Sequence, residues 1–384
     1  MNKKFFIAAM AAVVSFGMIS CSQDDDIANV ASNNNKIENS APGRIEFTGL
    51  VANSPATRGT AITAAADVAN FQVFGFLADG TQYVGSALNS GIMIDKNGAN
   101  WDYRTASDVA YWPKAVVNFQ AISPASDASF SIEETDLESN NQRLTAIVNV
   151  PTDQSAQKDI MFAKTSEDGN DHTADSNPAV GLTFDHAMSQ VVFKGKVASD
   201  KISVTVADIK IMNAYQEGKV GYFGASQALS SDLTGHYANQ DYSAGLVADP
   251  TLNAANVSTA KDLSAADGAL FMLPQTVTKW ATVAGTPVTV AAAEGTASAN
   301  GQGILAIKCT ITSAGQTLVN DEYVYIPFEI SWLQGKKYIY TLVFGKGTGA
   351  FDEDGEPLDS MLPITYTVSA VNAWTDVTPD DIEF

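Results

Sequence analysis

Short apolar runs recur along the chain, and residues that favour turns separate them. Residues 44–51 alternate, with Ile45, Phe47 and Val51 on one face and polar residues on the other, which is typical of a half-buried strand. Only residues 60–70 show a helical period, over a turn or two. The other runs predict strands at residues 71–78, 115–122, 144–150, 182–197, 202–212, 268–277, 303–311, 323–330, 337–344 and 364–374. We therefore expect an all-β fold built from sandwiches.

A polar stretch at residues 165–179, with Pro178 near its end, interrupts this succession of strands. We place a domain boundary there, which predicts an N-terminal β-sandwich domain at residues 44–178 and a C-terminal one at residues 179–384. A single larger sandwich with a long excursion is the alternative, because a polar loop alone does not prove a boundary.

Two of the expected strands carry further detail. In residues 202–211 the apolar phase shifts between Val206 and Ile209, which predicts a β-bulge. Cys309 lies in an alternating strand and is expected to be a small buried apolar residue. The only other cysteine is Cys21, so the fold cannot depend on a framework of disulfides.

The first residues have the layout of a secretory signal. Lys3 and Lys4 precede an apolar run at residues 5–17, which is too short to span a bilayer comfortably. Residues 18–20 and the cysteine that follows resemble the lipobox of bacterial lipoproteins. That resemblance implies cleavage of a signal peptide at residues 1–20 and acylation of Cys21, for example with palmitate. An ordinary signal peptide beside an incidental cysteine is the alternative.

Acyl chains on Cys21 would hold the protein on a membrane without a spanning segment. The acidic residues 24–26 resemble the surface-export signal of Bacteroidota lipoproteins, which is the favoured interpretation, and a solvated charge run is the alternative. Residues 21–43 are acidic, then Asn-rich, without a hydrophobic period, and we expect a flexible tether. The predicted location is the outer face of the outer membrane.

The formal net charge of −21 excludes one large class of partners. Such an acidic chain repels phosphate backbones, and no basic patch interleaved with aromatic residues occurs in the sequence. We therefore predict no binding to nucleic acid.

Candidate chemistry is sparse. His172, His186 and His236 are the only histidines, and their positions give neither a metal-ligand spacing nor a set of nucleophile, base and acid. The sequence thus predicts no enzyme, no metal and no cofactor, and His186 is expected to be a structural hydrogen-bonding residue. Residues 111–113 (Tyr-Trp-Pro) could form a sugar platform, but core packing is the favoured interpretation.

Several segments together resemble the fimbrillin family, the Bacteroidales pilus subunits and their relatives. The likeness lies in their order and spacing over nearly the whole chain. The segments are the lipobox at Cys21, the first strand leading to Thr57, Arg58 and Gly59, and residues 184–193, 273–275, 332–342 and 371–377. The resemblance implies two transthyretin-like β-sandwich domains.

The resemblance also implies a mode of assembly. A surface arginine-specific protease would cut between Arg58 and Gly59, and the first strand, with Ile45, Phe47 and Val51, would leave its sheet. A strand at residues 364–374 of the next subunit would take its place. The donor residues are Ile364, Tyr366 and Val368. Cleavage after Arg44 instead would sever the tether but leave the strand in place.

The resemblance therefore implies a structural fimbrial subunit that polymerises with other subunits and serves adhesion to a host or bacterial surface. It leaves open whether the chain is a stalk, tip or anchor subunit. It also leaves open whether residues 364–374 are donated or stay in their own domain. The alternative is a monomeric surface lipoprotein that binds glycan or protein ligands.

Overall fold

The structure is a computed structural model that describes residues 43–51, 68–85, 90–135, 144–173, 175–223, 228–234, 239–280, 301–345 and 365–372. Several sequence predictions lie outside these residues: the signal peptide, almost all of the tether, the expected helical turn and, singly, Cys21, Arg58, Gly59, His236 and Ile364. Val51, Tyr366 and Val368 are described as strand backbone only.

Strands dominate the fold, which confirms the all-β prediction. In chain order they begin with β1 (Phe47–Val51), β2 (Asn70–Leu77), β3 (Gln82–Val84), β4 (Ile92–Asn97), β5 (Asn100–Tyr103), β6 (Val116–Ser123), β7 (Phe130–Thr135), β8 (Leu144–Asn149), β9 (Met161–Asp168) and β10 (Val180–His186). They continue with β11 (Ser189–Val197), β12 (Ile202–Tyr215), β13 (Glu217–Phe223), β14 (Ala228–Asp232), β15 (Asn239–Ser243), β16 (Thr251–Leu252), β17 (Lys261–Asp262), β18 (Leu270–Met272), β19 (Thr276–Val277), β20 (Ile304–Ser313), β21 (Gln316–Pro327), β22 (Ile330–Ser331), β23 (Lys336–Phe344) and β24 (Thr365–Asn372). Single-turn 3-10 helices lie at η1 (Ala106–Asp108), η2 (Gln154–Ala156) and η3 (Ala254–Asn256). Within the described part of the chain, no helix is long and apolar enough to cross a membrane.

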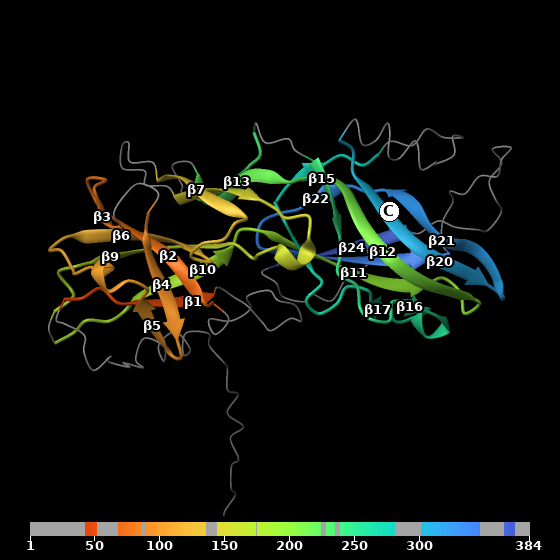
Figure 1. Cartoon of the computed structure of the whole chain (residues 1–384), viewed down its shortest axis with the longest axis horizontal. Coiled ribbons are helices and arrows are strands. Elements are labelled where there is room, and N and C mark those ends of the chain that lie inside the picture. The colour runs from red at the N-terminus through yellow and green to blue at the C-terminus, as the bar shows by residue number, and fades with distance from the viewer. Residues whose placement is uncertain are drawn as a thin grey trace, which may run out of the picture. The chain divides into compact units, whose positions relative to one another are not determined.

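The first sheet has the strand order β1-β10-β9-β6-β2-β4-β5, with β3 paired to β2 (Figure 1). β1 therefore forms one end of the order, and it pairs in parallel with β10, from Phe47 opposite Val180 to Val51 opposite Phe184. Alternating side chains of this sheet enclose an apolar core that includes Ile45 and Phe47. The first strand predicted from sequence is thus an edge strand.

A second, larger core takes side chains from the first sheet, namely Phe74, Phe76, Ile122 and Phe162, and from three further sheets: β14-β13-β8-β7, β17-β11-β23-β24 and β15-β12-β20-β21. β24 is at the end of its sheet and pairs antiparallel with β23, from Thr365 opposite Val343 to Asn372 opposite Lys336. Both chain-terminal strands of the described residues are therefore edge strands.

Strand pairing crosses the expected domain boundary at two places. β10, just beyond residue 178, pairs with β9 and β1, and β13 pairs with β8. The run at residues 182–197 is two strands because the chain turns at the buried residues Ala187 and Met188, where it passes from the first sheet to another. The division into residues 44–178 and 179–384 stays a prediction.

The predicted bulge in β12 is confirmed. The pairing of β12 with β20 shifts register between Val206 and Asp208. The side chain of Asp208 accepts hydrogen bonds from Tyr323 Oη at 2.8 Å and Ser243 Oγ at 3.3 Å. Asp208, at the bulge, thus bonds to β15, which pairs with β12, and to β21, which pairs with β20.

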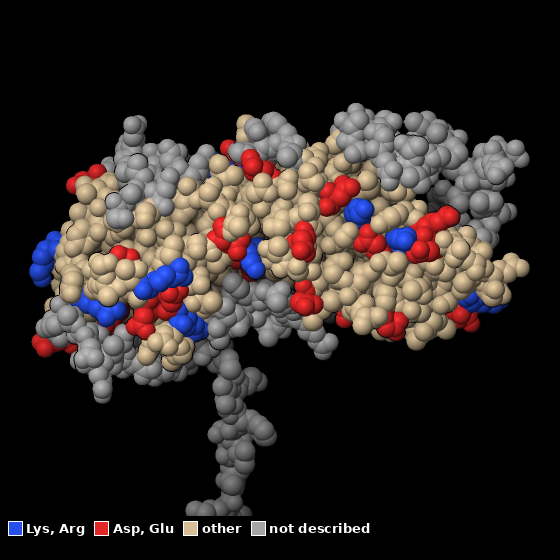
Figure 2. Space-filling model, in the orientation of Figure 1, with Lys and Arg blue, Asp and Glu red and all other residues tan. Residues whose placement is uncertain are grey.

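Ion pairs on the surface contribute little to this fold. Figure 2 shows basic side chains lying beside or among acidic ones, and Arg104 pairs with Asp95 at 2.7 Å and Lys308 with Asp321 at 3.0 Å. The Arg104 hydrogen bond lowers the pKa of Asp95. Because these side chains are more than a third exposed, such pairs are worth about 0–1 kcal/mol. Apolar packing between sheets therefore carries the stability.

Cys309 gives a direct test of that packing. It is fully buried in β20, and burial raises the pKa of its thiol to about 12. At about pH 8, roughly one thiol in ten thousand is then the reactive thiolate, against about one in four for a free thiol. In a Cys21→Ser chain we expect no reaction of the native protein with a thiol reagent and full reaction in denaturant. Rapid labelling of the folded protein would contradict the buried position.

Candidate functional site

The first strand is held along both borders near its beginning and along one border afterwards. Glu46 O accepts a hydrogen bond from Val180 N at 2.7 Å on the β10 side. On the other side Ile45 N donates to Ala110 O at 2.9 Å, and Gly43 O accepts from Trp112 N at 2.7 Å. From Phe47 onwards, the pairing between described residues is with β10 alone. Most of β1 is thus attached by a single ladder.

Apolar packing supplies the other part of the attachment. Ile45 is fully buried and Phe47 is 4% exposed. The Phe47 ring lies 5.5 Å from Phe119 and 6.4 Å from Phe71, between centroids and nearly edge to face. Burial of such side chains is worth about 1.5–3 kcal/mol each, and aromatic pairs of this geometry add to it.

Gly49 explains a break in the apolar pattern of this strand. A Cβ atom at Gly49 would lie 3.1 Å from the Trp101 ring and 3.4 Å from the Phe71 ring. The missing side chain lets these two rings approach the β1 backbone. A groove left by β1 would accordingly be lined by large apolar side chains of the same core: Phe71, Trp101, Tyr103, Phe119, Val180 and Leu182.

Arg44, one of the two candidate cleavage residues, lies inside this network. Its carbonyl oxygen accepts a hydrogen bond from Asn177 Nδ2 at 2.7 Å, and its guanidinium lies 5.0 Å from the centre of the Tyr103 ring. Tyr103 Oη donates to Ile45 O at 2.7 Å, and burial raises the pKa of this phenol, which keeps it a neutral donor. The peptide bonds on either side of Ile45 are therefore fixed by the surrounding residues.

His172 belongs to the same network, which sequence reasoning missed. Its ring stacks on the Trp112 ring at 3.6 Å and 14°, and its Nδ1 lies 3.1 Å from Asn177 Oδ1. Asn177 in turn holds the Arg44 carbonyl oxygen. In the sequence His172 is only a histidine in a polar loop, because its stacking partner Trp112 lies far away along the chain. Trp112 packs on Phe119 at 5.8 Å, as the core-packing interpretation expected, whereas Tyr111 is 50% exposed.

His186 hydrogen-bonds a side chain, as predicted. Its Nδ1 lies 2.9 Å from Asp159 Oδ2 and 3.0 Å from Oδ1, and both side chains are buried. No group of three or more potential metal-ligating side chains occurs within the described ranges.

The structure does not bring the predicted donor strand to the predicted groove. β24, which includes Tyr366 and Val368, lies beside β23 of its own chain, while Ile45 and Phe47 lie in the first core. Arg58 and Gly59 are outside the described residues.

The contribution of β1 packing can be measured with Phe47→Ala. Loss of a fully packed phenylalanine should lower the free energy of unfolding by about 3–5 kcal/mol. The control is Thr48→Ala, on the half-buried opposite face of the strand, which should cost less than about 1 kcal/mol. Urea-induced unfolding measures both, and equal costs would contradict the role of Phe47 in the core.

The sequence is similar to that of one known protein family. A family model described as fimbrillin-like matches residues 57–361. No curated protein matches the chain.

A comparison with solved structures gives several matches of low sequence identity. A candidate cell adhesion protein from Bacteroides uniformis is 13% identical, with a TM-score of 0.45 over 87% of this chain and 100% of that one. A candidate cell adhesion protein from Bacteroides eggerthii is 16% identical, with a TM-score of 0.45 over 87% and 98%. The fimbrial anchor protein Mfa2 from Porphyromonas gingivalis is 11% identical, with a TM-score of 0.34 over 87% and 98%. Because the family model spans most of the sequence, the chain belongs to the fimbrillin-like family.

Proposed function

We propose that this protein is a fimbrial subunit that polymerises by strand exchange after an arginine-specific protease removes its first strand. Membership of the fimbrillin-like family supports the coarser part, a fimbrial or adhesion role at the cell surface. The finer part rests on one observation: β1 is an edge strand that nevertheless completes an apolar core.

Removal of β1 would expose a groove with two binding features. The β10 edge would offer unpaired backbone groups, and the core would offer the pockets left by Ile45 and Phe47. An incoming strand gains ladder hydrogen bonds from the first and burial of alternate side chains from the second. The lost burial amounts to several kcal/mol, which is a large part of the usual 5–15 kcal/mol of stability. The cleaved subunit is thus primed to take a replacement.

Arg58, and not Arg44, is the proposed cleavage site. A protease needs an extended, accessible backbone, and the bonds around Arg44 and Ile45 are fixed by Asn177, Ala110 and Tyr103. Arg58 follows β1 in a stretch that contains Asn53, Ser54, Pro55 and Gly59, which favours a turn-forming loop. Cleavage between Arg58 and Gly59 would release the whole of β1, which ends at Val51.

Residues 364–374 are the proposed donor. β24 is an edge strand that pairs with β23 alone among the described strands, so it can leave by breaking one ladder. Ile364, Tyr366 and Val368 alternate in the sequence and suit a groove that held Ile45 and Phe47 at alternate positions. Because donor and groove are different surfaces, the contact does not close on itself and generates a filament.

The location follows from the sequence. Lipidation at Cys21 would hold the precursor on the outer face of the outer membrane, and the residues after it would space the body from the lipid. The proposed partners are other fimbrial subunits, the arginine-specific protease and a ligand on a host or bacterial surface.

The cleavage site can be tested on the purified precursor. The chain has only four arginines, so single variants can distinguish Arg58 from Arg44. Treatment with an arginine-specific protease should give a new N-terminus at Gly59 and a ladder of polymers in gel filtration. Arg58→Ala should abolish both results, whereas Arg44→Ala, the matched control, should leave both unchanged.

Polymers from the Arg58→Ala chain, or a cleaved chain that stays monomeric, would contradict the proposal. N-terminal sequencing of each product distinguishes a missing cut from a missing exchange.

A chain that ends at Pro363 tests the donor. It retains β1 and its groove, so the protease should still cut it after Arg58, but it should form no polymer alone. Once cleaved itself and added to cleaved full-length protein, it should shorten the polymers by capping one end. Polymers of normal length formed by the shortened chain alone would show that another segment fills the groove.

A further inference from the structure

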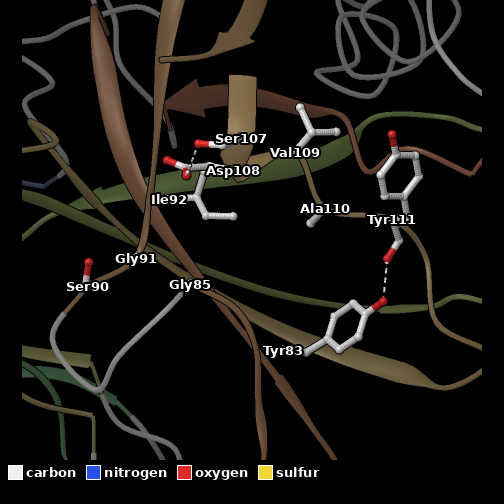
Figure 3. Close-up of a pocket in the computed structure, with 10 residues that line it drawn as sticks. All are labelled: Tyr83, Gly85, Ser90, Gly91, Ile92, Ser107, Asp108, Val109, Ala110 and Tyr111. Atoms are coloured by element: carbon white, nitrogen blue, oxygen red, sulfur yellow. Dashed lines mark hydrogen bonds between the residues drawn. The ribbon is translucent and has the colours of Figure 1, made fainter. Parts of the chain in front are cut away.

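A pocket of about 460 Å³ lies beside the segment that pairs with Arg44 and Ile45, just before β1 (Figure 3). Its walls come from β3, from the beginning of β4, and from η1 with the residues that follow it. This volume lies within the range of about 300–1,000 Å³ that is usual for small-ligand sites. The residues that line it are Tyr83, Gly85, Ser90, Gly91, Ile92, Ser107, Asp108, Val109, Ala110 and Tyr111.

Two exposed tyrosines stand at this pocket. Tyr83 is 37% exposed and Tyr111 50% exposed, and they are among the few large apolar side chains exposed in the described residues. Tyr83 Oη donates a hydrogen bond to Tyr111 O at 2.8 Å, so the two walls are tied together (Figure 3). This hydrogen bond uses the main-chain oxygen of Tyr111. The exposed aromatic ring of Tyr111 is therefore available to contact a ligand.

The polar groups of the pocket suit an uncharged ligand that donates hydrogen bonds. Among the described residues that line the pocket, Asp108 alone is charged, and Ser107 Oγ lies 3.3 Å from its Oδ1. A carboxylate accepts hydrogen bonds from several hydroxyl groups at once. Together with the net charge of −21, it repels anionic ligands such as phosphates.

Two glycines make the main chain itself part of the lining. A Cβ at Gly91 would lie 2.5 Å from Val73 O, and Gly85 has φ +105° with a Cβ that would lie 2.7 Å from Ser90 O. Neither position accepts a side chain without displacing backbone. These glycines therefore let neighbouring backbone approach closely at the wall of the pocket.

We propose that this pocket binds a neutral mono- or disaccharide. The C–H face of a sugar ring carries a slight positive charge and packs on the negative face of the Tyr111 ring. Its hydroxyl groups donate to the Asp108 carboxylate and exchange hydrogen bonds with Ser107 and the glycine backbone.

The pocket depends on an intact first strand. Ala110 O accepts the hydrogen bond of Ile45 N, and Tyr111 forms a β-bridge with Arg44. The wall that carries Asp108 and Tyr111 is therefore continuous with the pairing of β1. The test must use the uncleaved protein.

The uncleaved protein is titrated with glucose, galactose, mannose, N-acetylglucosamine, fucose, lactose and cellobiose, and binding is followed by calorimetry and by saturation-transfer NMR. At least one sugar should bind saturably with a Kd of about 10 mM or tighter. Tyr111→Ala and Asp108→Asn should each weaken it by about tenfold or more, whereas Tyr111→Phe should retain it.

Leu333→Ala is the matched control, because Leu333 is 62% exposed and lies outside the pocket; it should change nothing. Circular dichroism confirms the fold of each variant. The proposal is overturned if none of these sugars binds saturably, or if Tyr111→Ala and Asp108→Asn bind as tightly as the parent. It is also overturned if tetramethylammonium or inorganic phosphate binds at the pocket and the sugars do not.

Discussion

The attachment of β1 to its sheet is the constraint on which the rest of this structure depends. Hydrogen bonds hold most of the strand on one border only, while Ile45 and Phe47 complete a core that the other strands leave open. An edge strand ordinarily carries little of a core. Here an edge strand and the residues just before it contribute two of the buried side chains, Phe47 and Ile45, so the same segment is both removable and costly to lose.

The beginning of β1 is where the fold, the cleavage question and the pocket meet. Asn177, Ala110 and Tyr103 fix the backbone around Arg44 and Ile45, and the segment that contains Ala110 continues into the pocket wall at Asp108. Loss of β1 would therefore remove hydrogen bonds from a segment that lines a candidate binding site. Assembly and ligand binding would be linked through a short shared stretch of backbone.

The hydrophobic period within each strand predicted those features of the fold that depend on residues close together in sequence. The alternation in residues 44–51 predicted the burial of Ile45 and Phe47, and the phase shift after Val206 predicted the bulge in β12. It could not predict the parallel pairing of β1 with β10, the pairing of β8 with β13 or the stacking of His172 on Trp112. These contacts join residues far apart in sequence, and no period within a strand specifies its partner. The pocket also had no sequence signal beyond Tyr111, because its walls come from three separate segments.

The central claim is that the position beside β10 changes occupant when the subunit assembles. A structure of the protease-generated polymer tests it most directly, because the density beside β10 identifies the strand that lies there. The account predicts residues 364–374 of a neighbouring subunit, with β1 absent from the polymer. Residues 47–51 of the same subunit still paired with Val180–His186, and β24 still paired with β23 of its own chain, would contradict it.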